Sequence, residues 1–302
     1  MLGSRVAIRF AALLAVALVG ASGTGARPVG FVCPRVDAAC ASACDAASPA
    51  TLYTVGADEL PSPGPSIDVR LRARLVVTTA WPDGPLAFDR AAARAYLARI
   101  VQTTDDAFAP CGVGLDLDRA EVLAVPARLL TIDGNAPDAW GGLAPPGVDA
   151  DAFNYARGDR LPGPVRELFE RARDGASRSA IAIVVVDDVY YHAAGKRTRA
   201  GGLSFPPLVY HHPDDFPLRN GVLVGTGYLR CGELPIALHP RVVAHELGHM
   251  LLDTAHHDAD DANVMSPMLG PGLRPEQCAR IRAAATTTYG PEPVIDPRAP
   301  RG

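Results

Sequence analysis

The chain has 302 residues, of which 48% are hydrophobic, and a formal net charge of -4. This length and composition are those of an ordinary globular protein of one or two domains with a full-sized core. The charge is small and evenly mixed, without a dense run of lysine or arginine, so nucleic acids and other polyanions are excluded as expected partners.

The first residues have the pattern of a secretory signal peptide. Arg5 and Arg9 precede an apolar run at residues 10–19, and small residues follow as far as Ala26, the order that a signal peptidase recognises. We expect residues 1–26 to be removed and the mature protein to be secreted, into the extracellular or periplasmic space. Because the apolar run is shorter than the roughly 20 residues that span a bilayer, we expect no retained membrane anchor.

The segment after the signal has little regular patterning. Residues 27–66 are rich in Ala, Pro, Ser and Cys and show no sustained periodicity, which predicts a linker or a short pro-segment. We expect the main folded domain over residues 67–290 and a flexible tail at 291–302.

Helix and strand patterns alternate through the folded domain. The continuous β-branched run at 181–186 predicts a central strand buried on both faces, whereas residues 126–164 are Pro/Gly-rich and predict an irregular insertion. From period-two alternation and short apolar runs, the predicted strands are 69–77, 115–123, 181–186, 202–205 and 222–225. From apolar steps of three and four residues, the predicted helices are 89–108, 165–173, 240–253 and 275–285.

The helix at 240–253 carries the sequence His245-Glu246-Leu247-Gly248-His249. Side chains four residues apart lie on one helix face, so the two imidazoles can reach a single ion, with Glu246 beside them. Neutral imidazole suits Zn²⁺, and a catalytic zinc site has three protein ligands and one open position. The sequence therefore predicts one Zn²⁺ and a third ligand further along the chain.

The chain contains six cysteines, an even number in a compartment expected to be oxidising, which predicts disulfides. They are Cys33, Cys40, Cys44, Cys111, Cys231 and Cys278. The sequence does not fix their pairing, but Cys231 and Cys278 flank the predicted zinc helix, and a bridge between them would staple that segment.

Two histidines, an acidic loop and the segment Asn263-Val264-Met265-Ser266-Pro267 follow the zinc helix. Here the sequence resembles the metzincin clan of zinc peptidases, in which a third ligand and a methionine-containing turn follow the zinc helix. The resemblance covers roughly residues 67–290, and the segment 245–267 carries almost all of its specificity. It implies an α+β fold: a twisted, mostly parallel five-stranded sheet with an antiparallel edge strand, packed on a long helix and the zinc helix, with a small C-terminal subdomain holding one helix.

The resemblance also implies a chemistry. The protein would be a secreted endopeptidase acting on protein or peptide substrates, with Glu246 as general base on a zinc-bound water. Met265 would form an apolar floor beneath the ligands without binding zinc. The strand residues Gly202, Leu203 and Ser204 would pair with an extended substrate through backbone hydrogen bonds.

The spacing of the third ligand departs from the clan's pattern. Leu252 and Ala255 occupy the positions of the clan's glycine and third histidine, and the next histidines, His256 and His257, come one and two residues later. The helix must therefore end differently, or the loop must be longer. We favour His257 as the third ligand and keep His256 as its alternative. Further candidates, as substitute ligands or as groups that orient a ligating imidazole, are Asp253, Asp258 and Asp260.

Two other functions fit the same motif. In an H-E-x-x-H peptidase of the glutamate-ligand type, Glu276 on the last predicted helix would be the third ligand; the methionine-containing segment argues against this. A secreted binding module that holds zinc without activity is the second, and the presence of Glu246 argues against it.

Overall fold

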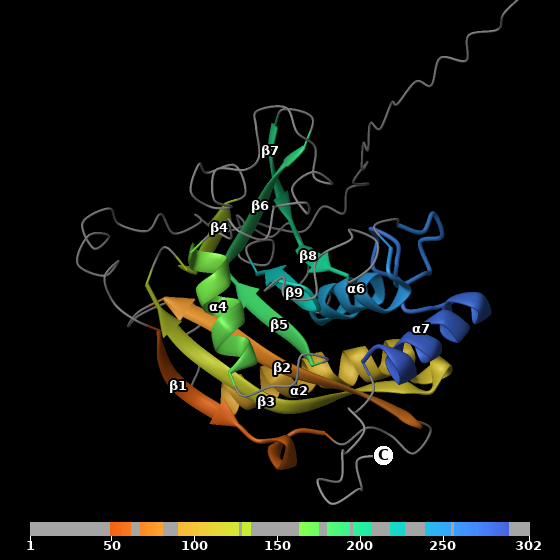
Figure 1. Cartoon of the computed structure of the whole chain (residues 1–302), viewed down its shortest axis with the longest axis horizontal. Helices are drawn as coiled ribbons and strands as arrows, with labels where there is room; N and C mark the ends of the chain where they lie inside the picture. Colours follow the sequence, from red (N-terminus) through yellow and green to blue (C-terminus); the bar gives the residue numbers. More distant parts are fainter. Residues whose placement is uncertain are drawn as a thin grey trace, which may run out of the picture. The chain divides into compact units, whose positions relative to one another are not determined.

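The described part of the computed structural model forms a mixed α/β fold (Figure 1). It comprises residues 49–61, 67–80, 90–126, 129–133, 163–174, 180–193, 196–206, 218–226, 239–254 and 257–289. The α-helices of this part are α2 (Arg90–Phe108), α4 (Gly163–Arg173), α6 (His239–Leu252) and α7 (Pro275–Thr287). All four were predicted to within a few residues. None of them is both long and apolar enough to cross a membrane.

The main sheet has six strands in the order β1-β3-β2-β5-β9-β8. In that order they are β1 (Ala50–Val55), β3 (Val113–Val125), β2 (Val69–Ala80), β5 (Ile181–Val186), β9 (Gly221–Gly225) and β8 (Gly202–Phe205). The three inner pairs are parallel, and the two outer pairs, β1–β3 and β8–β9, are antiparallel. The prediction of a mostly parallel sheet with an antiparallel edge strand is confirmed.

The predicted number of five strands is wrong, because β1 adds a sixth strand at the opposite edge from β8. It comes from the segment predicted as a linker, and its Val55 is buried against the core. The strand was missed because most of its side chains are at least partly exposed, so it has no clear apolar alternation. The sheet therefore begins before residue 67.

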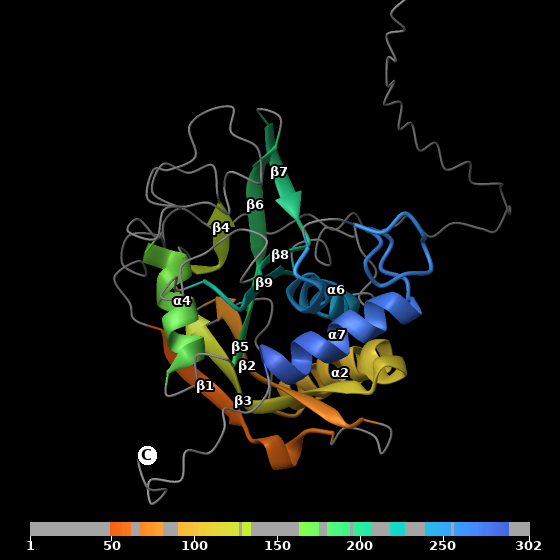
Figure 2. The same cartoon turned by 45° about the vertical axis from the view of Figure 1, so that its right-hand side comes forward.

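A second, three-stranded sheet with the order β4-β6-β7 was not predicted. Its strands are β4 (Thr131–Asp133), β6 (Asp188–Ala193) and β7 (Lys196–Ala200). β4 lies inside the segment 126–164, which was expected to be irregular throughout. In Figure 2 the β6–β7 hairpin extends beyond the main sheet. The sequence of β7, Lys-Arg-Thr-Arg-Ala, has only one apolar residue, so no hydrophobic period marked it as a strand.

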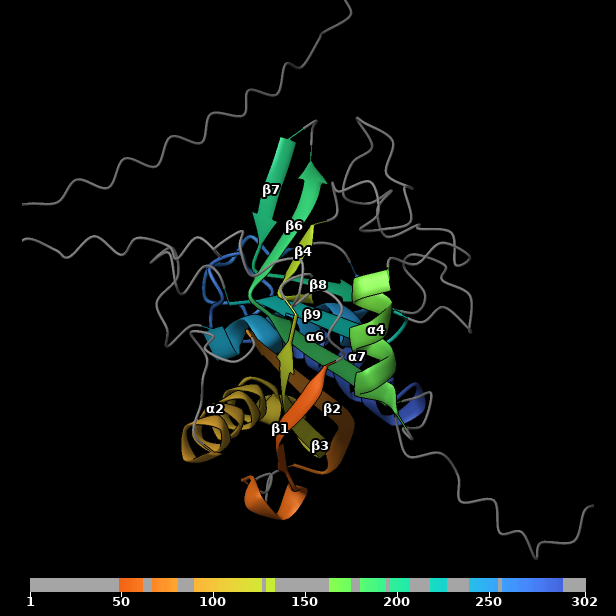
Figure 3. The ribbon, with the colours of Figure 1, turned by 90° about the vertical axis from the view of Figure 1, so that its left-hand side faces the viewer.

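The main sheet is covered on both faces, as the buried strand β5 required. The side chains of Ile181, Ile183 and Val185 belong to the core shared with α2 and α6, whereas Val184 and Val186 belong to the core shared with α4. Figure 3 shows α2 and α4 on opposite sides of the sheet. All six residues of β5 are buried, which confirms a central strand without a polar face.

One disulfide joins Cys111 to Cys278, with the two Cα atoms 4.7 Å apart. It links the short 3-10 helix η2 (Ala109–Cys111), which follows α2, to the first half of α7. The predicted bridge between Cys231 and Cys278 is therefore wrong. The prediction was based on closeness in the sequence, but Cys278 is bonded to Cys111 of η2, which lies 167 residues away along the chain. The other four cysteines lie outside the described residues.

Candidate metal centre

Helix α6 separates an apolar face from a face that carries the metal motif. His245, Glu246 and His249 are themselves buried, so the motif lies inside the protein rather than on a solvated helix. The four apolar residues expected from the sequence, Val243, Leu247, Met250 and Leu251, all pack α6 into the core, and Val242, Ala244 and Leu252 join them. The same 14-residue helix therefore anchors itself and presents the two histidines one turn apart.

Backbone carbonyl groups fix the orientation of both imidazoles. Nδ1 of His245 lies 2.7 Å from the carbonyl oxygen of Val264, and Nδ1 of His249 lies 2.8 Å from that of Thr254. A carbonyl oxygen can only accept, so each Nδ1 carries the hydrogen and donates it. The metal-binding lone pair of each ring is therefore on Nε2.

The two Nε2 atoms converge at a distance of 3.1 Å. Two lone pairs facing each other so closely repel unless a positive charge lies between them. Burial lowers the pKa of His245, although its bond to Val264 acts in the opposite direction, so a shared proton is disfavoured. The donor set thus fits a transition-metal cation such as Zn²⁺, which neutral imidazoles bind readily.

His257 completes a group of three histidines. Its ring centroid lies 5.2 Å from that of His245 and 5.1 Å from that of His249. One nitrogen from each of the three rings lies within 4.8 Å of the others, a spacing that allows them to hold one metal ion. Unlike the other two, His257 is exposed, so the group opens toward solvent on its side. His256 lies outside the described residues.

The route from α6 to His257 accommodates the unusual spacing. The helix ends at Leu252, and Asp253 takes a left-handed conformation with φ of 47°, which non-glycine residues seldom adopt. The N–H of Thr254 then bonds back to the carbonyl of His249 at 3.2 Å. The reversal therefore occurs one residue later than Leu252, the position where the clan has its glycine.

Three of the carboxylates considered as ligands, Asp258, Asp260 and Glu276, have other partners. Asp258 forms an ion pair with Arg274 and accepts from Gln277, and Asp260 accepts from the backbone N–H of Ala262 at 3.0 Å. Glu276 is exposed and pairs with Arg274 at 3.2 Å. Among the described residues, the only group of three or more potential ligands is that of the three histidines.

Glu246 is held by the edge strand β8. The hydroxyl of Ser204 donates to Oε2 of Glu246 at 2.6 Å. Burial raises the pKa of Glu246 to about 7, while the bond from Ser204 acts to lower it. A carboxyl group that titrates near neutrality can both accept and return a proton, which is the property required of a general acid and base.

Gly202 lies so close to Glu246 that no side chain would fit between them. A Cβ at position 202 would stand 2.6 Å from both Cγ and Oε1 of Glu246. Gly202 and Ser204 are two residues apart and therefore share one face of β8, while Leu203 packs against the core on the α4 side. The strand thus turns its small residues toward the carboxylate.

Met265 lies under the turn of α6 that separates the two buried histidines. It is buried, and its sulfur is the atom that a Cβ on Gly248 would strike. The structure therefore places the glycine of His-Glu-Leu-Gly-His and the methionine in direct contact. Sequence reasoning gave Met265 a place below the ligands but did not assign Gly248 a role.

Other parts of the site carried no signal in the sequence. The carbonyls of Val264 and Thr254 are backbone groups, which every residue has, so no residue type marks them. Gln277, whose amide contacts the loop after His257, was an ordinary polar residue of a helix. Only the spacing of the histidines and the methionine was informative.

No known protein family matches the chain, and no curated protein does. Its class therefore follows from fold and site alone. It is a mixed α/β protein with a mostly parallel sheet, in which three histidines, two of them on one helix, could hold a metal ion.

Proposed function

We propose that this protein is a secreted zinc-dependent endopeptidase of the metzincin type. The observation that carries the proposal is the convergence of His245, His249 and His257 beside the buried carboxyl group of Glu246. Three imidazoles with an open fourth position are the ligand set of a catalytic rather than a structural zinc site. Zn²⁺ bound there would lower the pKa of a water and polarise a substrate carbonyl.

Glu246 is the group that would move the proton. With its pKa near neutrality, it can take a proton from the attacking water and pass it to the nitrogen that leaves when the C–N bond breaks. Ser204 holds one carboxylate oxygen, Oε2, while the other, Oε1, lies close to Gly202. The reaction consumes one water and yields a carboxylic acid and an amine, without any other reactant.

Strand β8 supports a peptide as the substrate. It is the last strand of the main sheet and pairs on one side with β9. An extended peptide can add to such an edge through backbone hydrogen bonds. Because Gly202 and Ser204 of this strand contact Glu246, a peptide on this edge would pass close to the general base.

The proposed location rests on the signal-like N-terminus and on the disulfide. A bridge between Cys111 and Cys278 is typical of a protein that folds in an oxidising compartment. Peptidase activity outside the cell or in the periplasm is consistent with both.

The test is a metal assay combined with a cleavage screen on the purified full chain. We expect one zinc per chain, cleavage of an unbiased peptide library, loss of cleavage with a chelator, and recovery on adding Zn²⁺. Glu246→Gln should retain zinc and lose cleavage by at least about 10²-fold. Zinc retention without cleavage in the native protein would instead support a binding module.

The third ligand is tested by three separate substitutions. We expect His257→Ala to lose zinc, and His256→Ala and Glu276→Gln to retain it. Loss of zinc only in the Glu276 variant would support the glutamate-ligand alternative, which the exposed ion pair between Glu276 and Arg274 argues against.

A further inference from the structure

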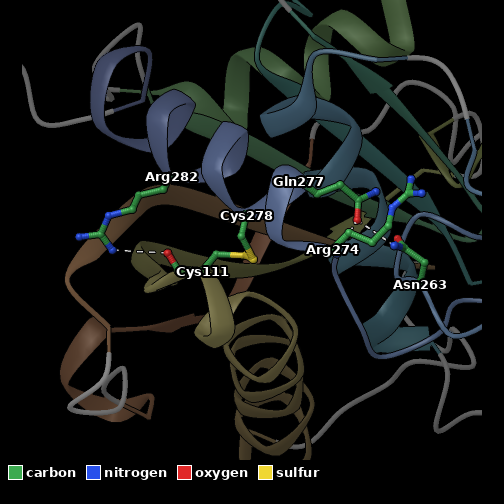
Figure 4. Close-up of a disulfide and its surroundings, with 6 residues drawn as sticks. All are labelled: Cys111, Asn263, Arg274, Gln277, Cys278 and Arg282. Carbon is green, nitrogen blue, oxygen red and sulfur yellow. Dashed lines mark hydrogen bonds between the residues drawn. A yellow bond between two sulfur atoms is a disulfide. The ribbon is translucent and has the colours of Figure 1, made fainter.

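Gln277 connects helix α7 to the loop that follows the third histidine. It lies in the first turn of α7 and is buried. Figure 4 shows its side chain directed toward Asn263 and Arg274, whereas Cys278, the next residue, points away into the disulfide with Cys111. A buried amide must have its hydrogen bonds satisfied, so its partners are informative.

Both ends of the Gln277 amide are occupied. Oε1 accepts from Nδ2 of Asn263 at 2.7 Å and from the backbone N–H of Arg274 at 2.8 Å. Nε2 donates to Oδ2 of Asp258 at 3.3 Å. This orientation is the only one that works, because a backbone N–H needs an acceptor and a carboxylate needs a donor.

The bond to Asp258 fixes the residue directly after His257. The carboxylate of Asp258 is shared by Gln277 and Arg274, and its backbone N–H donates to the carbonyl of Met265 at 2.9 Å. The chain on the C-terminal side of His257 is thereby attached both to α7 and to the methionine turn. This attachment limits where the exposed ring of His257 can lie.

The bond to Asn263 reaches a second histidine. Oδ1 of Asn263 accepts from the N–H of Met265 at 2.8 Å, which shapes the turn at Val264. The carbonyl of Val264 in turn receives the Nδ1 hydrogen of His245 at 2.7 Å. One side chain on α7 therefore contacts both Asp258, which follows His257, and Asn263, which precedes the residue whose carbonyl binds His245.

We propose that Gln277 is a positioning residue of the metal centre. It holds the loop from Asp258 to Asn263 so that His257 lies beside the two histidines of α6 and the Val264 carbonyl accepts from His245. This inference rests on the proposed function. It assigns no contact between Gln277 and metal or substrate. Hydrogen-bond partners that orient ligands in this way typically change metal affinity by about 10- to 100-fold when they are replaced.

Helix α7 is held in place independently of this loop. The disulfide joins it to η2, and Arg282 pairs with Asp68 at 3.0 Å and donates to the carbonyl of Cys111 at 3.4 Å. The position of Gln277 is thus set by the protein core. Arg282 also supplies a matched control, because it anchors the same helix without contacting the loop.

The experiment compares zinc affinity across variants of the full chain with its disulfide formed. Affinity is measured by competition with a chromophoric chelator, and the ligand geometry is followed by the visible spectrum of the Co²⁺ form. Gln277→Glu keeps the acceptor for Asn263 but places a second carboxylate against Asp258. We expect it to weaken zinc binding by about 10- to 100-fold and to change the Co²⁺ spectrum, and we expect Arg282→Gln to do neither.

A rescue tests whether the effect passes through Asp258. In the double variant Asp258→Asn with Gln277→Glu, donor and acceptor are exchanged, whereas Asp258→Asn alone shows the effect of losing the ion pair with Arg274. We expect the double variant to bind zinc more tightly than the two single losses together predict. Should Gln277→Glu not fold, Gln277→Met removes all three hydrogen bonds of the amide with a side chain of similar length. We expect it to weaken zinc binding by about 10- to 100-fold, and zinc binding as tight as in Arg282→Gln would overturn the inference.

The outcomes separate this inference from the proposed function. If the native protein binds no zinc, the proposed function fails. If it binds zinc and loses it with His257→Ala, while Gln277→Glu binds as tightly as Arg282→Gln, the proposed function stands and the inference is overturned. A double variant whose loss of zinc affinity equals the sum of the losses in Gln277→Glu and Asp258→Asn also overturns it.

Discussion

The hydroxyl of Ser204 donates a 2.6 Å hydrogen bond to Oε2 of Glu246. The bond joins the last strand of the main sheet to the metal-motif helix, at the one carboxyl group that lies between the two buried histidines in the sequence. Burial raises the pKa of that carboxyl group to about 7, and the Ser204 donor opposes the rise. Helix α6, which buries Glu246, and strand β8, which supplies the Ser204 donor, therefore both affect the pH at which Glu246 is ionised.

Replacing Ser204 by alanine should move the acidic limb of the pH–activity profile to higher pH. Glu246 must be ionised to accept a proton, and without its donor the pKa of Glu246 rises further. We expect a shift of about one pH unit, which lowers kcat/KM at pH 6 by about tenfold and leaves zinc content unchanged.

Ser204→Thr is the matched control for this shift, since it keeps the hydroxyl group and tolerates a strand conformation. We expect its acidic limb to stay near that of the native protein. An alanine variant whose profile falls uniformly at all pH values would show that Ser204 does not act through the ionisation of Glu246.

A methyl group at Gly248 should disturb the site through Met265. A Cβ there would overlap the sulfur of Met265, which is buried and has little room to move. We expect Gly248→Ala to lower the free energy of unfolding by about 1–3 kcal/mol and to weaken zinc binding. Urea unfolding and chelator competition measure the two effects.

The same substitution in a Met265→Ala background separates contact from helix propensity. With the sulfur gone, the extra methyl group has space, and alanine is a better helix former than glycine by about 1 kcal/mol. We expect Gly248→Ala to become neutral or stabilising there. A cost that is equal in both backgrounds would contradict the contact as its cause.

The fold was predictable from the sequence where apolar periodicity is strong. Strand β5 and helices α2 and α6 have many buried side chains at regular spacing, and hydrophobic periodicity is the main local signal of such elements. Strand β1 was missed because it has no clear apolar alternation and depends on pairing with the distant strand β3, and β7 was missed because its sequence is polar. Pairing of that kind is a tertiary property.

The site was predictable only as far as side-chain spacing reaches. His245, Glu246 and His249 follow from a helix period, and His257, favoured from the sequence as the third ligand, lies beside the two histidines in the structure. Contacts across the fold had no local signature: the Nδ1 acceptors are backbone carbonyls, Gly202 matters because Glu246 lies against it, and the partner of Cys278 lies 167 residues away.

Removal of strand β1 should destabilise the protein. Val55 and Leu60 are buried in the main core, and Glu59 forms an ion pair with Arg90 of α2 at 2.6 Å. A protein that starts at residue 67 loses these contacts and exposes the edge of β3. We expect its free energy of unfolding to be at least about 3 kcal/mol lower than that of the full chain, or the protein to aggregate.

A protein that starts at residue 49 is the control, since it keeps all of β1. We expect it to unfold in urea like the mature protein. Equal stability of the two truncated proteins would show that residues 49–66 are dispensable and would support the prediction of a linker or removable pro-segment up to residue 66.

Protonation of His239 should make the protein less stable in acid. It begins α6, is buried, and lies with Nδ1 2.8 Å from the hydroxyl of Tyr96. Its Nε2 has no hydrogen-bond partner among the described residues, so a proton added to the ring would be buried without an acceptor. Burial lowers the pKa of His239 to about 4, from an ordinary value of 6.5.

The sign of the effect follows from linkage. A histidine whose pKa is lowered by folding binds a proton more readily when the chain is unfolded, so its contribution is complete above pH 6.5 and is lost as the pH falls toward 4. A difference of this size corresponds to about 3 kcal/mol. We expect the free energy of unfolding of the native protein, measured in urea, to fall by roughly that amount as the pH is lowered across this range, in addition to the effects of other groups.

His239→Asn isolates the contribution, because asparagine keeps a polar atom near the position of Nδ1 but does not titrate. Since the other histidines are common to both proteins, their effects cancel in the difference between the two unfolding free energies. We expect that difference to favour the native protein most above pH 6.5 and to shrink steadily as the pH falls to 4. A difference that stays constant over this range would mean that His239 is as easily protonated in the folded protein as in the unfolded chain.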